Sequence, residues 1–208
     1  MRVLADVLAK YKKESQRPGN MGYSPLQCAL YAGDEEDFNA LIQYYESDGD
    51  ALMHELRYTS VGITKEHILH VAMKHAQLFE MCCRVIERTD VRLFNDLLFQ
   101  ADADGDTLFH KMATFGRVES LDILQSYLEK YVEISDMQKA LALTNSRGET
   151  ARDIAENYDA TATIAKLKED AVLTEMQLEV ARENQVRILG KFTEIGIRSE
   201  LPINQLNE

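Results

Sequence analysis

The sequence predicts an all-α solenoid of about four helix-turn-helix repeats. Three observations predict it. Apolar residues recur at helical spacing, the same turn followed by two short amphipathic helices returns at nearly constant distance, and 3 prolines, 10 glycines and no tryptophan in 208 residues leave little room for an all-β fold. Because so short a helix pair cannot bury its apolar face alone, the copies are expected to stack on one another.

The clearest copy runs from residue 102 to residue 124. Asp102 can accept a hydrogen bond from its own backbone, and Gly105 can adopt the positive φ angle of a tight turn. Thr107 stands where a hydroxyl can cap the first helix, and Gly116 ends that helix. The apolar faces of the two helices comprise Leu108, Phe109, Met112 and Ala113, then Val118, Leu121, Ile123 and Leu124.

Three further copies share this layout. First helices are expected to start at Ser24, His67, Thr107 and Thr150, at spacings of 43, 40 and 43 residues. In the weakest copy Lys65 replaces the turn glycine and Ala76 replaces the glycine between the helices. Such regular spacing is typical of a repeat protein.

These residues resemble the ankyrin family, whose repeat reads D-x-x-G-x-T-P-L-H-x-A-A-x-x-G. The matching positions are Ser24, Pro25, Leu26, Ala29 and Gly33; Leu69, His70 and Ala72; Asp102, Gly105, Thr107, His110, Ala113 and Gly116; and Thr150, Ala151 and Asp153. The resemblance covers residues 19–170 and implies four repeats, at about 19–58, 62–101, 102–144 and 145–170. It also implies that His70 and His110 bridge the loops of neighbouring repeats through hydrogen bonds.

The period departs from the family. Ankyrin repeats have about 33 residues, so each unit here carries an insert. Segments that begin at Asp50, Asp90 and Asp136 combine an N-cap residue with apolar helical spacing. They predict a short third helix where the family projects a β-hairpin finger. A period near 40 also suits HEAT or armadillo repeats, but these lack the turn-Gly-x-Thr opening.

Both ends of the chain are expected to be helical. An N-terminal helix within residues 1–18 carries the stripe Val3, Leu4, Val7, Leu8 and Tyr11 and would cover the first repeat. A second helix is expected from Ala160 to Leu189, with fraying after Gly190. Its thin seam consists of Ile164, Leu167, Ala171, Thr174, Leu178, Ala181, Gln185 and Ile188. Residues 171–208 are expected to form a C-terminal extension that follows the repeats.

Charge and hydropathy disfavour some classes of protein. The net charge of −12 disfavours nucleic-acid binding, which requires clustered cations. No apolar run is long enough to cross a bilayer, and Asp6 and Lys10 interrupt a secretory apolar core, so we expect a protein of the cytoplasm that does not bind membranes. We also expect a monomer. Asp34, Glu35, Glu36 and Asp37 could steer a basic partner surface. Alternatively, they complement the dipole of the helix that they begin.

Residues that could carry chemistry are sparse. Asp102, Asp104 and Asp106 are spaced like part of a calcium loop, but Ala113 occupies the position of the closing glutamate. The histidines near Cys82 and Cys83 lack the spacing of a zinc site. No catalytic or phosphate-binding motif is present. We therefore expect no metal, no cofactor and no enzymatic activity. The alternatives are a hydrolase or transferase whose site lies in the inserted or C-terminal helices, and a structural protein that self-associates through the helix from Ala160 to Leu189.

The resemblance indicates where a partner protein would bind. Residues at the family's groove positions are Tyr23, Tyr31, Glu66, Lys74, His75, Asp106, Thr114, Phe115, Glu149, Asn157 and Tyr158. Three of them are aromatic at equivalent places (Tyr31, Phe115 and Tyr158), and aromatic side chains dominate interface energetics. The predicted function is a protein-protein interaction scaffold. The insert-bearing repeats are also similar in style to those of effectors that intracellular bacteria deliver into host cells, where such a protein would act in the host cytosol.

Overall fold

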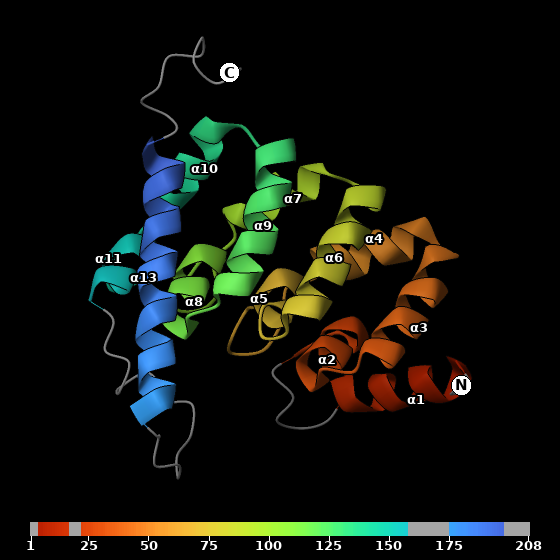
Figure 1. The fold of residues 1–208 in the computed structure, drawn as a ribbon. Helices are drawn as coiled ribbons and strands as arrows, with labels where there is room; N and C mark the ends of the chain where they lie inside the picture. The colour runs from red at the N-terminus through yellow and green to blue at the C-terminus, as the bar shows by residue number, and fades with distance from the viewer. Residues whose placement is uncertain (1–3, 17–21, 158–174, 198–208) are drawn as a thin grey trace. The chain divides into compact units, whose positions relative to one another are not determined.

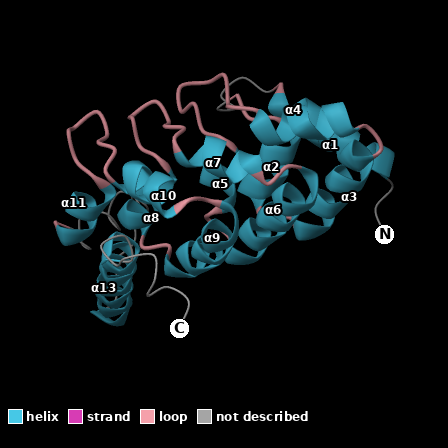
Figure 2. Ribbon diagram, turned by 90° about the horizontal axis from the view of Figure 1, so that it is seen from above, coloured by secondary structure: helices cyan, strands magenta, loops and turns pink. Residues whose placement is uncertain are grey.

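A computed structural model of the chain describes residues 4–16, 22–157 and 175–197. Within these ranges it contains twelve helices and no strand, so the predicted all-α class is confirmed (Figures 1 and 2). The chain divides into two compact units, Met1–Asp104 and Gly105–Glu208. The division falls at the turn that opens the third predicted repeat.

Seven helices form unit 1. They are α1 (Leu4–Ser15), α2 (Pro25–Ala32), α3 (Glu35–Glu46), α4 (Gly49–Arg57), α5 (Ile68–Ala72), α6 (Ala76–Thr89) and α7 (Arg92–Leu98). Helix α2 packs against α5, and each pairs with the longer helix that follows it, α3 or α6. The two predicted first helices of this unit therefore lie side by side. Its core includes Leu26, Leu41, Leu56, Ile68, Phe79 and Phe94, all of which are buried.

Helix α1 covers the outer face of α2 and α3 (Figure 1). Val7 and Tyr11 of its apolar stripe are each 1% exposed, whereas Leu8 is half-buried and Leu4 is 39% exposed. Lys10 fixes the helix, because its Nζ lies 2.7 Å from Oδ2 of the buried Asp37. The N-terminal helix thus covers the first helix pair as predicted.

Unit 2 contains α8 (Leu108–Phe115), α9 (Val118–Tyr131), α10 (Ile134–Leu141), α11 (Ala151–Glu156) and α13 (Glu175–Ile197). The predicted first helices α8 and α11 again pack on each other, and α13 packs along α9, α10 and α11 (Figure 1). Core residues of this unit include Phe109, Met112, Leu121, Leu124 and Leu128.

Helix α13 corrects the predicted C-terminal boundary. The chain was expected to fray after Gly190, but the helix runs through this glycine to Ile197. The buried seam extends past the glycine, since Gln185 and Ile188 are followed at 3-4-3 spacing by Phe192 and Ile195. Packing of this seam outweighs the roughly 1 kcal/mol that an interior glycine costs a helix. Residues 160–174, at the predicted start of the helix, lie outside the described residues.

The four predicted repeat openings share one backbone geometry. Gly22, Gly105 and Gly148 have φ angles of 73°, 77° and 76°, and Lys65 takes the same left-handed region with φ 52°. Two residues after each corner a capping box starts a helix, in which the N-cap and the third helical residue bond each other's backbone. The pairs are Ser24 with Gln27, His67 with His70, Thr107 with His110, and Thr150 with Asp153.

The three inserted segments are helical, as predicted, but their starts differ. Helix α4 is capped by Asp48, α7 begins after Val91 and α10 after Glu133, whereas Asp50 and Asp136 lie in first helical turns and Asp90 precedes α7. Asp48 is the better cap because its Oδ1 accepts from the amides of both Asp50 and Ala51. For α4 and α10 the choice lay between two acidic residues close together in the chain, Asp48 or Asp50 and Glu133 or Asp136.

The inserted helices do not replace the finger. Residues 58–67 after α4 and 142–150 after α10 still form hairpin-like turns, each closed by an antiparallel bridge, Thr59 to His67 and Thr144 to Thr150. The second turn extends beyond the helices of unit 2 (Figure 2). After α4 and after α10 the insert therefore adds a helix before a hairpin-like turn. None of the helices in the described ranges is both long enough and apolar enough to cross a membrane.

Candidate binding surface

Tyr23 is the centre of a polar cluster in unit 1. Its side chain is 5% exposed, and its hydroxyl donates to Oε2 of Glu66, which is 7% exposed. Burial, and then the hydrogen bond to Glu66, raise the pKa of the Tyr23 phenol far above its usual value. Both residues were expected to face a solvent-filled groove. They are instead buried, and each satisfies the hydrogen-bonding group of the other.

Tyr31 presents the exposed aromatic surface of this unit. Its ring is 49% exposed and lies 5.6 Å from the Tyr23 ring, centroid to centroid, at an interplanar angle of 44°. The Nζ atom of Lys74 sits 4.1 Å from the Tyr31 centroid, in cation–π geometry. The exposed His75 packs against Gly33, where an added Cβ would meet the imidazole at 2.9 Å. The structure therefore brings Tyr31, Lys74 and His75 close to one another.

The finger, residues 58–67, carries the most exposed large apolar side chains among the described residues. Val61 is 82% exposed and Ile63 is 85% exposed. Neither residue was predicted from the sequence as part of a binding surface. An apolar pair that flanks Gly62 in a turn between helices was the signal that could have identified them, because neither helical face accounts for it.

Hydrogen bonds on both sides hold the finger in place. The amide of Ser60 donates to the carbonyl of Glu66 at 2.9 Å, and the amide of Val61 donates to the carbonyl of Gly22 at 3.3 Å. The amide of Ala103 donates to the carbonyl of Thr64 at 2.8 Å. These bonds anchor the tip on both of its sides.

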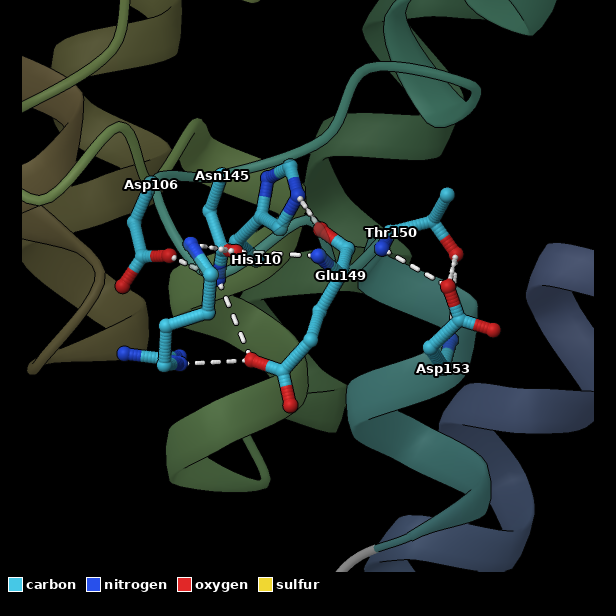
Figure 3. Close-up of polar contacts among 7 residues, drawn as sticks. Asp106, His110, Asn145, Glu149, Thr150 and Asp153 are labelled. Atoms are coloured by element: carbon cyan, nitrogen blue, oxygen red, sulfur yellow. Dashed lines mark hydrogen bonds and ion pairs between the residues drawn. The ribbon is translucent and has the colours of Figure 1, made fainter.

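The bridging role that the resemblance implied for His110 is seen in unit 2. Its Nε2 lies 2.9 Å from the carbonyl oxygen of Glu149, the residue before the next helix cap (Figure 3). In unit 1 Gln27 does the same, since its Nε2 donates to the carbonyl of Glu66 at 3.0 Å. Equivalent side chains thus tie α2 in unit 1 and α8 in unit 2 to the turn that follows in the repeat order.

Asp106 and Glu149, two predicted groove residues, meet through Asn145 (Figure 3). The Nδ2 of Asn145 donates to Oδ1 of Asp106 at 2.8 Å and to Oε2 of Glu149 at 3.4 Å. Asp106 is only 6% exposed, so it stabilises the turn at residues 142–150 and offers little surface to a partner. Arg147 also binds Glu149, with 2.6 Å between Nε and Oε2, and this contact lowers the pKa of the Glu149 carboxyl.

The remaining predicted groove residues do not form one site in the structure. Thr114 and Phe115 are half-buried at the end of α8, and Asn157 is exposed just after α11. Tyr158 lies outside the described residues. Because Tyr31 and Phe115 belong to different units, the groove that they were expected to share stays a prediction.

The acidic cluster at the start of α3 is largely structural. Asp34 caps the helix by accepting from the amide of Asp37 at 3.0 Å, and Asp37 is 1% exposed. Glu35 accepts from Nε2 of Gln77 at 2.7 Å, which leaves Glu36 as the fully exposed member of the cluster. These contacts favour the capping interpretation over steering of a basic partner.

Two of the three cysteines lie in environments that disfavour reactivity. Cys82 and Cys83 are completely buried, and burial raises the pKa of both thiols well above the usual value. Cys28 is half-buried, and its Sγ lies 3.8 Å from the carbonyl oxygen of Tyr23. No cluster of three or more metal-ligating side chains occurs in the part of the chain that the structure describes.

Comparison with known proteins assigns neither a family nor a function to the chain. No protein-family model matches the chain, and none of the curated proteins matches it either.

Proposed function

We propose that this chain is an ankyrin-like interaction module that binds a partner protein through one surface of unit 1. The surface, here called the Tyr31 surface, consists of Tyr31, Lys74 and His75 together with the finger-tip residues Val61 and Ile63. The observation that carries the proposal is the exposure of Val61 and Ile63, 82% and 85%, on a finger fixed by backbone hydrogen bonds.

Val61 and Ile63 gain almost no burial free energy when the chain folds, because both stay exposed. An aliphatic side chain left in water forgoes about 1.5–3 kcal/mol of burial free energy. Tyr31 forgoes part of the same gain, since its ring is half exposed. A partner that covers these residues recovers that free energy, and because the finger is already ordered the entropic cost of binding is reduced.

Tyr23 connects the two parts of the surface. Its ring contacts Tyr31, its hydroxyl bonds Glu66 at the end of the finger, and Thr64 of the finger forms a further hydrogen bond with it. The aromatic patch and the finger tip are therefore supported by one buried residue.

Recurring local geometry supports the ankyrin-like part of the proposal. Four corners share positive φ angles, four capping boxes follow them, and within each unit the first helices pack side by side.

The test compares partner capture by the wild type with capture by the double variant Val61→Ser/Ile63→Ser and by Tyr31→Ala. Proteins retained from cytosolic lysate by the wild type are identified, and their affinities for each variant are measured by calorimetry. We expect each exchange to weaken binding by more than about 1 kcal/mol, roughly fivefold, with unchanged thermal unfolding.

Val186→Ser provides the matched control. Val186 is an apolar residue of α13 that is 71% exposed and lies in unit 2. An equal loss of binding in this control would show that partner binding depends on general surface hydrophobicity and not on the Tyr31 surface. Undiminished binding by the Val61, Ile63 and Tyr31 variants would rule out the Tyr31 surface.

A further inference from the structure

The N-cap of α5 is an imidazole, where two of the other three repeat openings have threonine and one has serine. His67 is 1% exposed, and its Nδ1 accepts from the amide of Leu69 at 3.2 Å. Because Nδ1 uses its lone pair for this bond, it carries no proton, and the neutral ring bears its hydrogen on Nε2. No hydrogen-bond partner for this Nε2 is found among the described residues.

His70 repeats the arrangement one turn later. It is 0% exposed, and its Nδ1 accepts from the amide of His67 at 3.4 Å. The two rings are 3.7 Å apart, centroid to centroid, at an angle of 31°. If either Nδ1 took up a proton, it could no longer accept from the backbone N–H that it faces. The resulting imidazolium would also lie against the ring of the other histidine. Both rings are therefore held neutral by the bonds that begin α5.

The surroundings offer limited compensation for such a cation. The charged or titratable groups that act on His67 are His70 and Asp102, which lies in the loop after α7 and is 8% exposed. The carboxylate of the adjacent Glu66 is already bonded to Tyr23. Burial, and then His70, lower the pKa of His67, and Asp102 opposes this only in part.

The helices that pack on α5 supply no counter-charge to His67. From α2 the group that reaches the start of α5 is the neutral Gln27, whose amide bonds the carbonyl of Glu66. From α6 the buried face includes the thiols of Cys82 and Cys83, which burial keeps protonated and uncharged.

We propose that the His67–His70 pair is an acid-sensitive switch: proton uptake breaks the cap of α5 and releases this helix and the end of the finger from the rest of unit 1. The finger is affected because it ends at His67, which pairs with Thr59. Effects on partner binding rest on the function proposed above, whereas the effect on stability does not.

The sign of the effect follows from the direction of the shift. An unfolded histidine has a pKa of about 6.5, and the native value of His67 lies below it. Unit 1 therefore has its full stability above that pH and loses stability as the pH falls, because only the open state binds the proton. Between pH 7 and about pH 5.5 one such histidine raises the opening constant about eightfold.

Hydrogen exchange at the amides of Leu69 and Val71 measures this opening directly in the full chain. After correction for the intrinsic pH dependence of exchange, we expect protection to fall about eightfold or more over that interval. His67→Thr should abolish most of the fall, since it creates the Thr–His pair that Thr107 and His110 already form. His70→Gln is the second variant and mimics Gln27.

His75→Gln is the control, because His75 is an exposed histidine of the same unit. It should keep the wild-type dependence. An eightfold fall that persists in both His67→Thr and His70→Gln would overturn the proposal, as would wild-type protection that does not change. Nitrogen-15 spectra of the imidazoles provide a check independent of any variant. A proton on Nδ1 of His67 at neutral pH would also overturn it.

Discussion

Lys65 adopts a backbone conformation that glycine occupies at the three equivalent corners. Its φ angle is 52°, against 73°, 77° and 76° at Gly22, Gly105 and Gly148. A residue with a Cβ atom in this left-handed region costs about 1–2 kcal/mol. The surrounding bonds, including that from the amide of Ala103 to the carbonyl of Thr64, maintain the corner in spite of that cost.

Replacement of Lys65 by glycine should therefore stabilise the protein. We expect Lys65→Gly to raise the free energy of unfolding by about 0.5–1 kcal/mol, because relief of strain exceeds the added entropy of the unfolded chain. Urea denaturation is the measurement. Lys65→Ala separates strain from charge, since it removes the ammonium group but keeps the Cβ. A glycine variant no more stable than the alanine variant would contradict the strain argument.

The role of a single residue could be predicted from the sequence where a short-range hydrogen bond determines that role. Ser24, Thr107 and Thr150 are N-caps, and Asp102 accepts from the amide of Asp104 at 2.9 Å. The role could not be predicted where the partner is distant in the chain. Tyr23 was expected in solvent, but it is buried by Glu66, 43 residues away, and no local pattern encodes that pair.

Among the helices, α13 shows how tertiary packing overrides a local signal. Gly190 suggested an end to the helix, yet Phe192 and Ile195 beyond it are each 3% exposed. The Phe192 ring meets Phe109 of α8 edge-on at a centroid distance of 5.8 Å, and Nε2 of Gln185 donates to the carbonyl of Ala113 at 2.9 Å. These contacts lie 72 or more residues apart in sequence, so periodicity alone could not place the helix end.

Phe192→Ala tests this docking. Truncation of a fully buried phenylalanine costs about 3–5 kcal/mol through lost burial and the cavity that remains. We expect a loss of that size in equilibrium urea unfolding followed by circular dichroism. Val186→Ala, at a residue 71% exposed on the same helix, should change stability by less than about 0.5 kcal/mol. Similar effects of the two exchanges would show that α13 does not dock through Phe192.

For the molecule as a whole, the sequence predicted the helical class, the recurring openings and the helices at the two ends. It also predicted the inserted helices, with starts in error by one to three residues. It could not predict which exposed residues form a surface. Val61 and Ile63 flank Gly62 in a turn, but how far they are exposed depends on how the finger is held, through bonds to Gly22 and Ala103.

The full chain should be a monomer in solution. The seam of α13 was the predicted route to self-association, but the buried residues Gln185, Ile188, Phe192 and Ile195 already pack within unit 2. Light scattering over a range of concentrations should give a constant mass near 23.7 kDa. A mass that doubles with concentration, and that Val186→Ser restores to the monomer value, would contradict this and favour a structural role.

The four helix openings keep one pattern of bonds with four different pairs of side chains: Ser24 with Gln27, His67 with His70, Thr107 with His110, and Thr150 with Asp153. Any acceptor of suitable reach fills either place, so selection on the fold tolerates many exchanges there. Amino-acid identity can then drift over generations while the architecture persists. In such a lineage, common descent would be recognised from backbone angles long after the amino-acid sequences had diverged.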